Sequence, residues 1–137
     1  MPAGEWAKCK AFVRTRSGDR CELCGGRGRQ WPVECHEIWG YDESTWTQTL
    51  QGLIALCPPC HEVKHIGRAE TVGHLERAKN RLMVANGWGR LQVERYLAGV
   101  WATWNRRSAH QWTLDVTWLE TIGVDVPVIT DRPAPGR

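Results

Sequence analysis

The chain has 137 residues, is 42% apolar and carries a formal net charge of +3. These values suit a globular protein and permit a nucleic-acid partner without requiring one. No window approaches the roughly 18 uninterrupted apolar residues of a membrane span, so we expect no membrane partner. Residues 1–10 lack the apolar core of a secretory signal, and the sequence therefore predicts a soluble cytoplasmic protein.

The first half of the chain predicts one helix followed by strands. Trp6, Cys9 and Val13 recur at helical spacing within residues 1–20, before the breaker Ser-Gly-Asp. A turn and a glycine-rich basic loop follow. Pro32 cannot donate to a sheet ladder, so we expect the first strand to begin just after it.

That first predicted strand covers residues 33–41. Residues 42–50 are expected to be a loop that leads into a second short strand, which residues 51–56 complete. A proline pair then suits the start of a helix, where missing N–H groups are not needed. We expect this helix to end near Gly67.

The second half of the chain predicts helices. Apolar residues recur at helical intervals in 69–87, which ends with Asn-Gly, and again in 91–107. Residues 115–122 predict a final short helix, and the proline-rich residues 126–137 predict a flexible tail. The length favours one domain, at residues 1–125.

Four of the six cysteines form two Cys-x-x-Cys pairs, Cys21 with Cys24 and Cys57 with Cys60. Without a secretory signal, such pairs bind metal more often than they form disulfides. Zinc takes four soft ligands in a tetrahedron, and a closed four-thiolate site is structural rather than catalytic. The pairs therefore predict a structural zinc site; two unrelated pairs of buried cysteines are the alternative.

The zinc site leaves three nearby histidines without a ligand role. His61 and His65 are spaced by four, which places both on one helix face within reach of one ion or phosphate. His36 lies in the first strand between Glu34 and Glu37. It is either a satisfied polar residue at an edge or a general base whose proton a carboxylate attracts. If zinc ties the cysteine pairs together, His36 faces the other two histidines.

The segments CELCGGRG, VECHEIWGYDE and QGLIALCPPCHEVKH together resemble the HNH endonucleases over about residues 21–67. The resemblance implies an α+β fold with a ββα-metal core, stapled by the four-cysteine zinc, between an N-terminal helix and a helical extension at about 70–122. It implies metal-dependent hydrolysis of DNA phosphodiester bonds. His36 then matches the histidine that activates water, and His61 and His65 match ligands of the catalytic ion.

One departure from the family pattern concerns the middle residue of the motif. Gly52 stands where the family has an Asn that braces the loop holding the base histidine. Gln48 or Gln51 could replace it, because an amide makes the same kinds of hydrogen bond.

The second departure concerns the residue before the base. Cys35 stands where the family often has an Asp or His that ligates the ion. A thiolate there would favour a softer ion such as zinc over magnesium. The candidate catalytic ions are magnesium, manganese, nickel and zinc. Alternatively, Cys35 points into the core, and Asp42 or Glu34 completes the site.

Cations near the motif are candidates for phosphate contacts, namely Lys64, Arg27 and Arg29. Arg106 and Arg107 could extend a basic groove. Such contacts set affinity and salt dependence rather than sequence preference, so we expect weak sequence preference.

A catalytically inactive zinc module that binds nucleic acid or a protein partner is the alternative function. The two departures favour it. The surplus of histidines favours the enzyme, because a binding module with four zinc-binding cysteines needs no further metal ligands.

Overall fold

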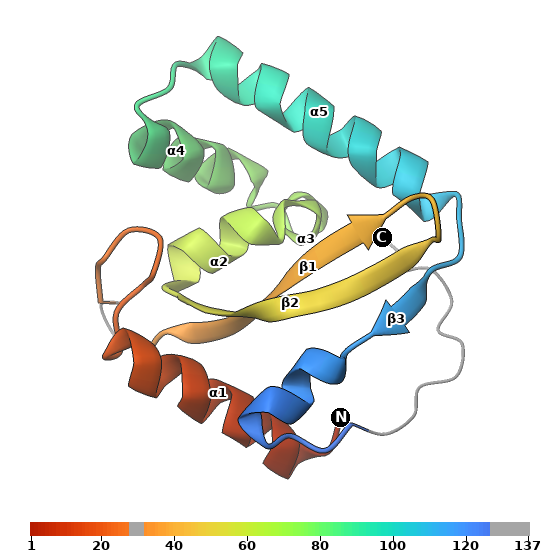
Figure 1. Cartoon of the computed structure of the whole chain (residues 1–137). Coiled ribbons are helices and arrows are strands. Elements are labelled where there is room, and N and C mark those ends of the chain that lie inside the picture. The colour runs from red at the N-terminus through yellow and green to blue at the C-terminus, as the bar shows by residue number, and fades with distance from the viewer. Residues whose placement is uncertain (28–31, 127–137) are drawn as a thin grey trace.

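The structure is a computed structural model that describes residues 1–27 and 32–126, and it is a mixed α+β fold (Figure 1). Its small sheet has three strands in the order β1-β2-β3. β1 (Glu34–Asp42) and β2 (Thr47–Leu56) form an antiparallel hairpin. The short β3 (Thr113–Asp115) pairs in parallel with the start of β2. The hairpin carries His36 and leads the chain to Cys57, just before the next helix.

Two helical elements cover one face of this sheet. α1 (Ala3–Ser17) ends at Gly18, which adopts the left-handed backbone that favours glycine, with a φ of 62°. The 3₁₀ helix η1 (Thr117–Ile122) lies beside α1 (Figure 1). Cys9 and Val13 of α1 are fully buried against the sheet. Burial of this face joins the chain's N-terminal and C-terminal segments in one hydrophobic cluster.

The other face of the sheet carries the remaining helices. α2 (Pro58–Lys64) follows β2 directly and begins with two prolines in its first turn. α3 (Ile66–Thr71), α4 (Leu75–Asn86) and α5 (Arg90–Ser108) follow, and they pack into a second hydrophobic cluster. Its buried members are Ile66, Ala69, Ala78, Leu82, Val93 and Leu97. The long α5 runs over α3 toward the β1–β2 turn (Figure 1).

The loop after α1 is hydrogen-bonded to the C-terminal part of β2, beyond the residues that pair with β3. The Glu22 N–H donates to the Ala55 carbonyl over 2.9 Å, and the Ala55 N–H donates to the Glu22 carboxylate over 2.8 Å. Arg16 of α1 donates to the same carboxylate over 2.6 Å and to the Leu53 carbonyl over 2.6 Å. These bonds hold the first Cys-x-x-Cys pair beside the second.

The sequence predictions differ from the fold in several places. β2 begins at Thr47, so residues 47–50 are strand rather than loop. The expected helix at 69–87 is divided after Thr71, because Gly73 adopts a φ of 81° and breaks the helical path. β3 was not predicted, since three residues are too short for a periodicity signal.

Three further predictions concern the end of α4, the C-terminal tail and membrane-spanning helices. The stop at Asn86-Gly87 is confirmed, with Gly87 in the left-handed conformation. The tail prediction for residues 126–137 falls almost entirely outside the described residues. Within the described ranges, none of the helices has the length and hydropathy needed to cross a bilayer.

Candidate metal centres

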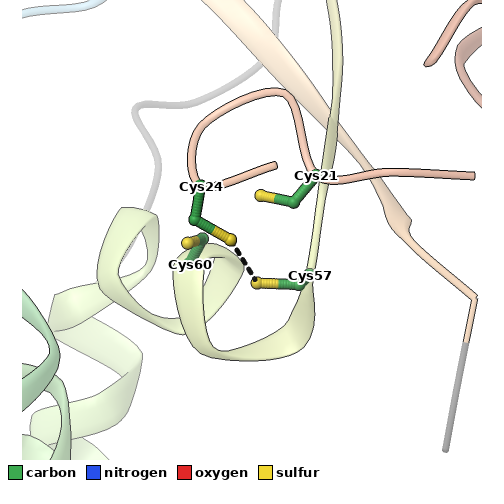
Figure 2. A group of neighbouring side chains, drawn as sticks. All are labelled: Cys21, Cys24, Cys57 and Cys60. Atoms are coloured by element: carbon green, nitrogen blue, oxygen red, sulfur yellow. Dashed lines mark hydrogen bonds between the residues drawn. The ribbon is translucent and has the colours of Figure 1, made fainter. Parts of the chain in front are cut away.

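The four cysteines of the two Cys-x-x-Cys pairs meet at one point (Figure 2). Cys21 and Cys24 come from the loop after α1, and Cys57 and Cys60 come from the start of α2. Their sulfur atoms all lie within 4.8 Å of one another, and the Cys24 and Cys57 sulfurs are 3.8 Å apart. This donor set suits zinc. The group could therefore hold a structural zinc ion, as the spacing predicts.

Backbone geometry favours the thiolate form of one of the four cysteines, Cys21. Gly25 adopts a φ of 73°, which lets the loop turn back so that its N–H bonds the Cys21 carbonyl over 2.8 Å. Burial disfavours the Cys21 thiolate, but N–H groups of Cys24, Cys57 and Leu23 stabilise it and lower its pKa to about 6. A thiolate so stabilised is ready to bind a metal.

A half-buried cation faces the same cluster. Arg81 of α4 points its Nη2 at the Cys60 sulfur over 3.3 Å. Four thiolates around a divalent ion would leave two negative charges, of which a guanidinium at this distance offsets one. Arg81 thereby connects the cysteine cluster to the second hydrophobic cluster, which contains Leu82. The sequence alone gave no signal for this contact.

Three histidines form a second group. His36 comes from β1, whereas His61 and His65 come from α2 and its C-cap. His36 Nδ1 lies 3.2 Å from His65 Nε2, and His65 Nε2 lies 3.1 Å from His61 Nε2. One ring nitrogen of each histidine lies within 4.8 Å of the others. The three imidazoles could therefore share one metal ion.

The environment of His36 and His65 favours their neutral forms. Burial, with the nearby His65 and His61, lowers the pKa of His36 to about 4. Burial and His61 also lower the pKa of His65. A neutral imidazole offers a lone pair that a metal can use without displacing a proton. The lowered pKa values of His36 and His65 are thus compatible with a metal site.

A carboxylate orients the third ring. Glu34 Oε2 accepts a hydrogen bond from His61 Nδ1, which leaves His61 Nε2 as the unprotonated nitrogen turned toward His65. Histidine ligands in metal sites are commonly oriented by such a carboxylate. Glu34, which was expected to complete the site, lies beside His61, and its role there stays a prediction.

Two charged side chains near the histidines were not predicted as functional. Glu37 Oε2 lies 4.0 Å from His36 Nδ1. Arg68 lines a hollow of about 420 Å³ together with His61 and His65. Arg68 could have been found from its position three residues after His65, but the helix was expected to end at Gly67. α3 begins at Ile66, with one residue between it and the end of α2, so the chain is helical again at Arg68.

Cys35 requires a correction as a candidate metal ligand. It is 6% exposed and packs in the same hydrophobic cluster as Cys9, and burial raises its pKa to about 12. Successive strand residues point to opposite faces of a sheet, so His36 and Cys35 cannot both face α2. Cys35 is therefore not brought together with the histidines and belongs to the core.

The remaining support residues lie away from the histidines. Asp42 accepts hydrogen bonds from Ser44 in the β1–β2 turn. Gln51 packs over Gly40, where a Cβ would come within 2.3 Å of its Nε2. Neither side chain is therefore placed beside the histidines, where Asp42 was expected to complete the site and Gln51 to replace the Asn of the motif.

Gln48 and Gly52 also do not contact the histidines. Gln48 bonds Tyr41 over 3.4 Å. A Cβ at Gly52 would meet apolar atoms of Ile38 and Trp118, both at 3.9 Å. The position that carries Asn in the HNH pattern thus adjoins apolar side chains here.

The predicted phosphate contacts are spread over the surface. Lys64 is exposed, lowers the pKa of His36 through its charge, and so lies on the histidine side of the molecule. Arg27 is exposed at the end of the first described range, and Arg29 lies outside the described residues. Arg106 pairs with Glu43 over 3.0 Å.

Comparisons with known proteins identify no relative of this chain. No protein-family model matches it, and searches of curated proteins and of solved structures gave no match. Function is therefore inferred from the residues and their geometry.

Proposed function

We propose that this protein is a metal-dependent endonuclease of the HNH type that hydrolyses DNA phosphodiester bonds. The observation that carries the proposal is the group of three histidines contributed by a strand and the helix that follows its hairpin. This arrangement is what a ββα-metal core requires. The four-cysteine cluster at the start of α2 supports it, because a zinc ion there would fix the helix that carries His61.

The chain's own residues supply the parts of a phosphodiester-cleaving site. His61 and His65 would hold a divalent ion, and Glu34 keeps His61 in the tautomer with a free Nε2. An ion held there supplies positive charge that stabilises the transition state at phosphorus. Lys64 and Arg68, on the same surface, would hold the flanking phosphates through charge-assisted hydrogen bonds.

His36 has two roles open to it. Its neutral Nδ1 could accept the proton of the attacking water, as the HNH resemblance implies. The same Nδ1 lies 3.2 Å from His65 Nε2, which equally suits a third metal ligand. In that second role, Glu37, whose carboxylate lies 4.0 Å from His36 Nδ1, could accept the proton. Metal affinity separates the two roles.

The test is nicking of supercoiled plasmid by the purified zinc-containing protein with added magnesium, manganese, nickel or zinc. We expect nicking by the wild type and a loss of at least about a hundredfold in His61→Ala and in His36→Ala. The matched control is His110→Ala, because His110 stacks on Trp46 at the β1–β2 turn and is exposed. This variant should nick at the wild-type rate.

Metal titration of the same variants assigns His36. A general base leaves the ion affinity of His36→Ala close to that of the wild type, whereas a third ligand weakens it as much as His61→Ala does. Absence of nicking with every ion, in a folded protein that contains zinc, would reject the nuclease and favour the inactive zinc-binding module.

A further inference from the structure

Two adjoining hollows separate α5 from the hairpin and α2. The first, about 650 Å³, is lined by β1, β2 and α5 and is called here the α5 pocket. Its lining includes Tyr41, Gln48, Lys64, Tyr96, Trp104 and Arg107. The second, about 700 Å³, is lined by His65 and Arg68 as well as by α5.

Shared residues make these hollows one continuous surface. Lys64 and Trp104 line both, while His65 lines the second hollow and also the smaller one beside His61. A polymer strand that crosses the histidine group could therefore place a neighbouring unit in the α5 pocket. The course of α5 above α3 toward the β1–β2 turn frames this path (Figure 1).

The α5 pocket combines aromatic rings with a buried amide. Gln48 is only 9% exposed, and its hydrogen bond to the Tyr41 hydroxyl is long at 3.4 Å. An amide carries two donors and an acceptor. Gln48 therefore places a largely buried amide in the wall of the pocket, where a group inserted into the pocket could bond it.

The charges of the pocket favour an anionic ligand. Lys64 and Arg107 line it, and its described lining contains no carboxylate. The Arg107 guanidinium lies 3.8 Å from the centre of the Tyr41 ring. Its Nε is buried and donates no hydrogen bond, and the Glu43 carboxylate lies 3.7 Å from this nitrogen. Aromatic rings beside cations suit a planar base attached to a phosphate.

We propose that the α5 pocket binds one unpaired nucleobase of the DNA strand that is cut at the histidine group. A paired base cannot reach Gln48, because the amide is buried and the base must leave the stack to present its edge. Trp104 supplies the stacking surface, and Gln48 reads the base edge. The inference rests on the proposed nuclease function and assigns it a preference for DNA with an extruded or single-stranded nucleotide.

The experiment measures binding and cutting separately. Binding of the zinc-containing protein is followed by fluorescence anisotropy, without added divalent ions, on a paired duplex, on the same duplex with one bulged adenine, and on one with an abasic bulge. We expect the bulged adenine to bind at least about fivefold more tightly than the other two, as stacking of one base implies.

Variants on α5 and β2 locate the preference. Trp104→Ala should abolish the preference for the bulged adenine, and Trp104→Phe, which keeps a ring, should retain part of it. Gln48→Leu keeps the volume of the side chain and should remove discrimination between bulged adenine and bulged thymine. Leu91→Ala, at an exposed position of the same helix that does not line the pocket, should bind like the wild type.

The outcomes distinguish the two proposals. Equal affinity for paired, bulged and abasic duplexes, or a Trp104→Ala effect equal on all three, would overturn the pocket even if the protein nicks plasmid. A preference for the bulged adenine in a protein that nicks nothing would retain the pocket and reject the nuclease.

Discussion

At the scale of single residues, the contact between Glu34 and His61 controls whether the histidine group can act as a metal site. His61 can present Nε2 to an ion only if the ring proton stays on Nδ1, and the Glu34 carboxylate accepts the hydrogen bond from that nitrogen. Without this partner the ring is free to adopt the other tautomer or to rotate. Loss of such a carboxylate typically lowers metal affinity by about 10- to 100-fold.

We therefore predict that Glu34→Ala weakens binding of a divalent ion at the histidine group by about 10- to 100-fold and leaves the four-cysteine site filled. The measurement is calorimetric titration of zinc-containing protein with nickel, combined with elemental analysis. Glu70→Ala is the matched control, because Glu70 is exposed on α3 and has no hydrogen bond to the histidines. Equal nickel affinity in Glu34→Ala and the wild type would contradict the orienting role.

The period of a strand explains which site residues could be predicted. Glu34 and His36 are two apart and share a face, whereas Cys35 points to the opposite face and into the core. The alternation is visible in the sequence and would have excluded Cys35 as a ligand beside His36. Arg81 and Trp104, by contrast, approach their sites through packing between helices, which leaves no pattern in the local sequence.

At the scale of elements, Glu22 joins three segments at the edge of β2. Its carboxylate accepts hydrogen bonds from the Ala55 N–H and from Arg16. Burial opposes the charged form, but Arg16 and the Ala55 N–H outweigh it and hold the pKa of Glu22 below 4.5. Because the folded pKa is lower than the unfolded one, this stabilisation is present above pH 4.5 and is lost as the pH falls through the folded value.

We predict that Glu22→Gln lowers the free energy of unfolding by about 1–2 kcal/mol at pH 7. Hydrogen bonds to charged groups contribute about 1.5–3 kcal/mol. The expected value is lower because the Glu22 side chain is partly exposed to solvent. The difference from the wild type should shrink as the pH falls below 4.5. Urea unfolding across pH 3–7 measures it, and Glu120→Gln, at an exposed carboxylate of η1, is the control. A difference that is constant across this range would reject the charge of Glu22 as the cause.

Element boundaries were predictable where a residue imposes backbone geometry and unpredictable where tertiary pairing decides. The two prolines at the start of α2 and Gly87 at the end of α4 lie where the sequence indicates. β2 extends back to Thr47 because β1 and β3 flank it at that end. The polar residues 47–49 alone suggested a loop, since neither pairing partner can be inferred from local spacing.

At the scale of the whole molecule, the cysteine cluster lies where two hydrophobic clusters meet. Cys21, Cys57 and Cys60 belong to the cluster formed by the sheet and α1, and Arg81 contacts Cys60 from within α4 of the other cluster. α2 begins at this point and carries His61 toward β1. A zinc ion at the cluster would therefore fix both the relative placement of the two halves and the histidine group.

We predict that Cys60→Ser, which removes one ligand, lowers bound zinc well below one ion per chain and abolishes the cooperative thermal transition. The apparent binding free energy of a structural zinc, about 10–16 kcal/mol, is comparable with the total stability of about 5–15 kcal/mol expected of a small domain. Elemental analysis and near-ultraviolet circular dichroism of the tryptophans measure the two effects. Cys9→Ala is the control, because Cys9 is buried in the same hydrophobic cluster outside the four-cysteine group and should lose only about 1 kcal/mol of stability.

Cys60→Ser also distinguishes whether zinc or side-chain packing alone holds α2 in position. If zinc positions α2, Cys60→Ser should also lose nickel binding at the histidines, although His36, His61 and His65 are unchanged. Cys9→Ala should keep that binding despite its lower stability. A zinc-free Cys60→Ser that unfolds cooperatively at the wild-type temperature and binds nickel normally would mean that packing alone holds α2 against the hairpin.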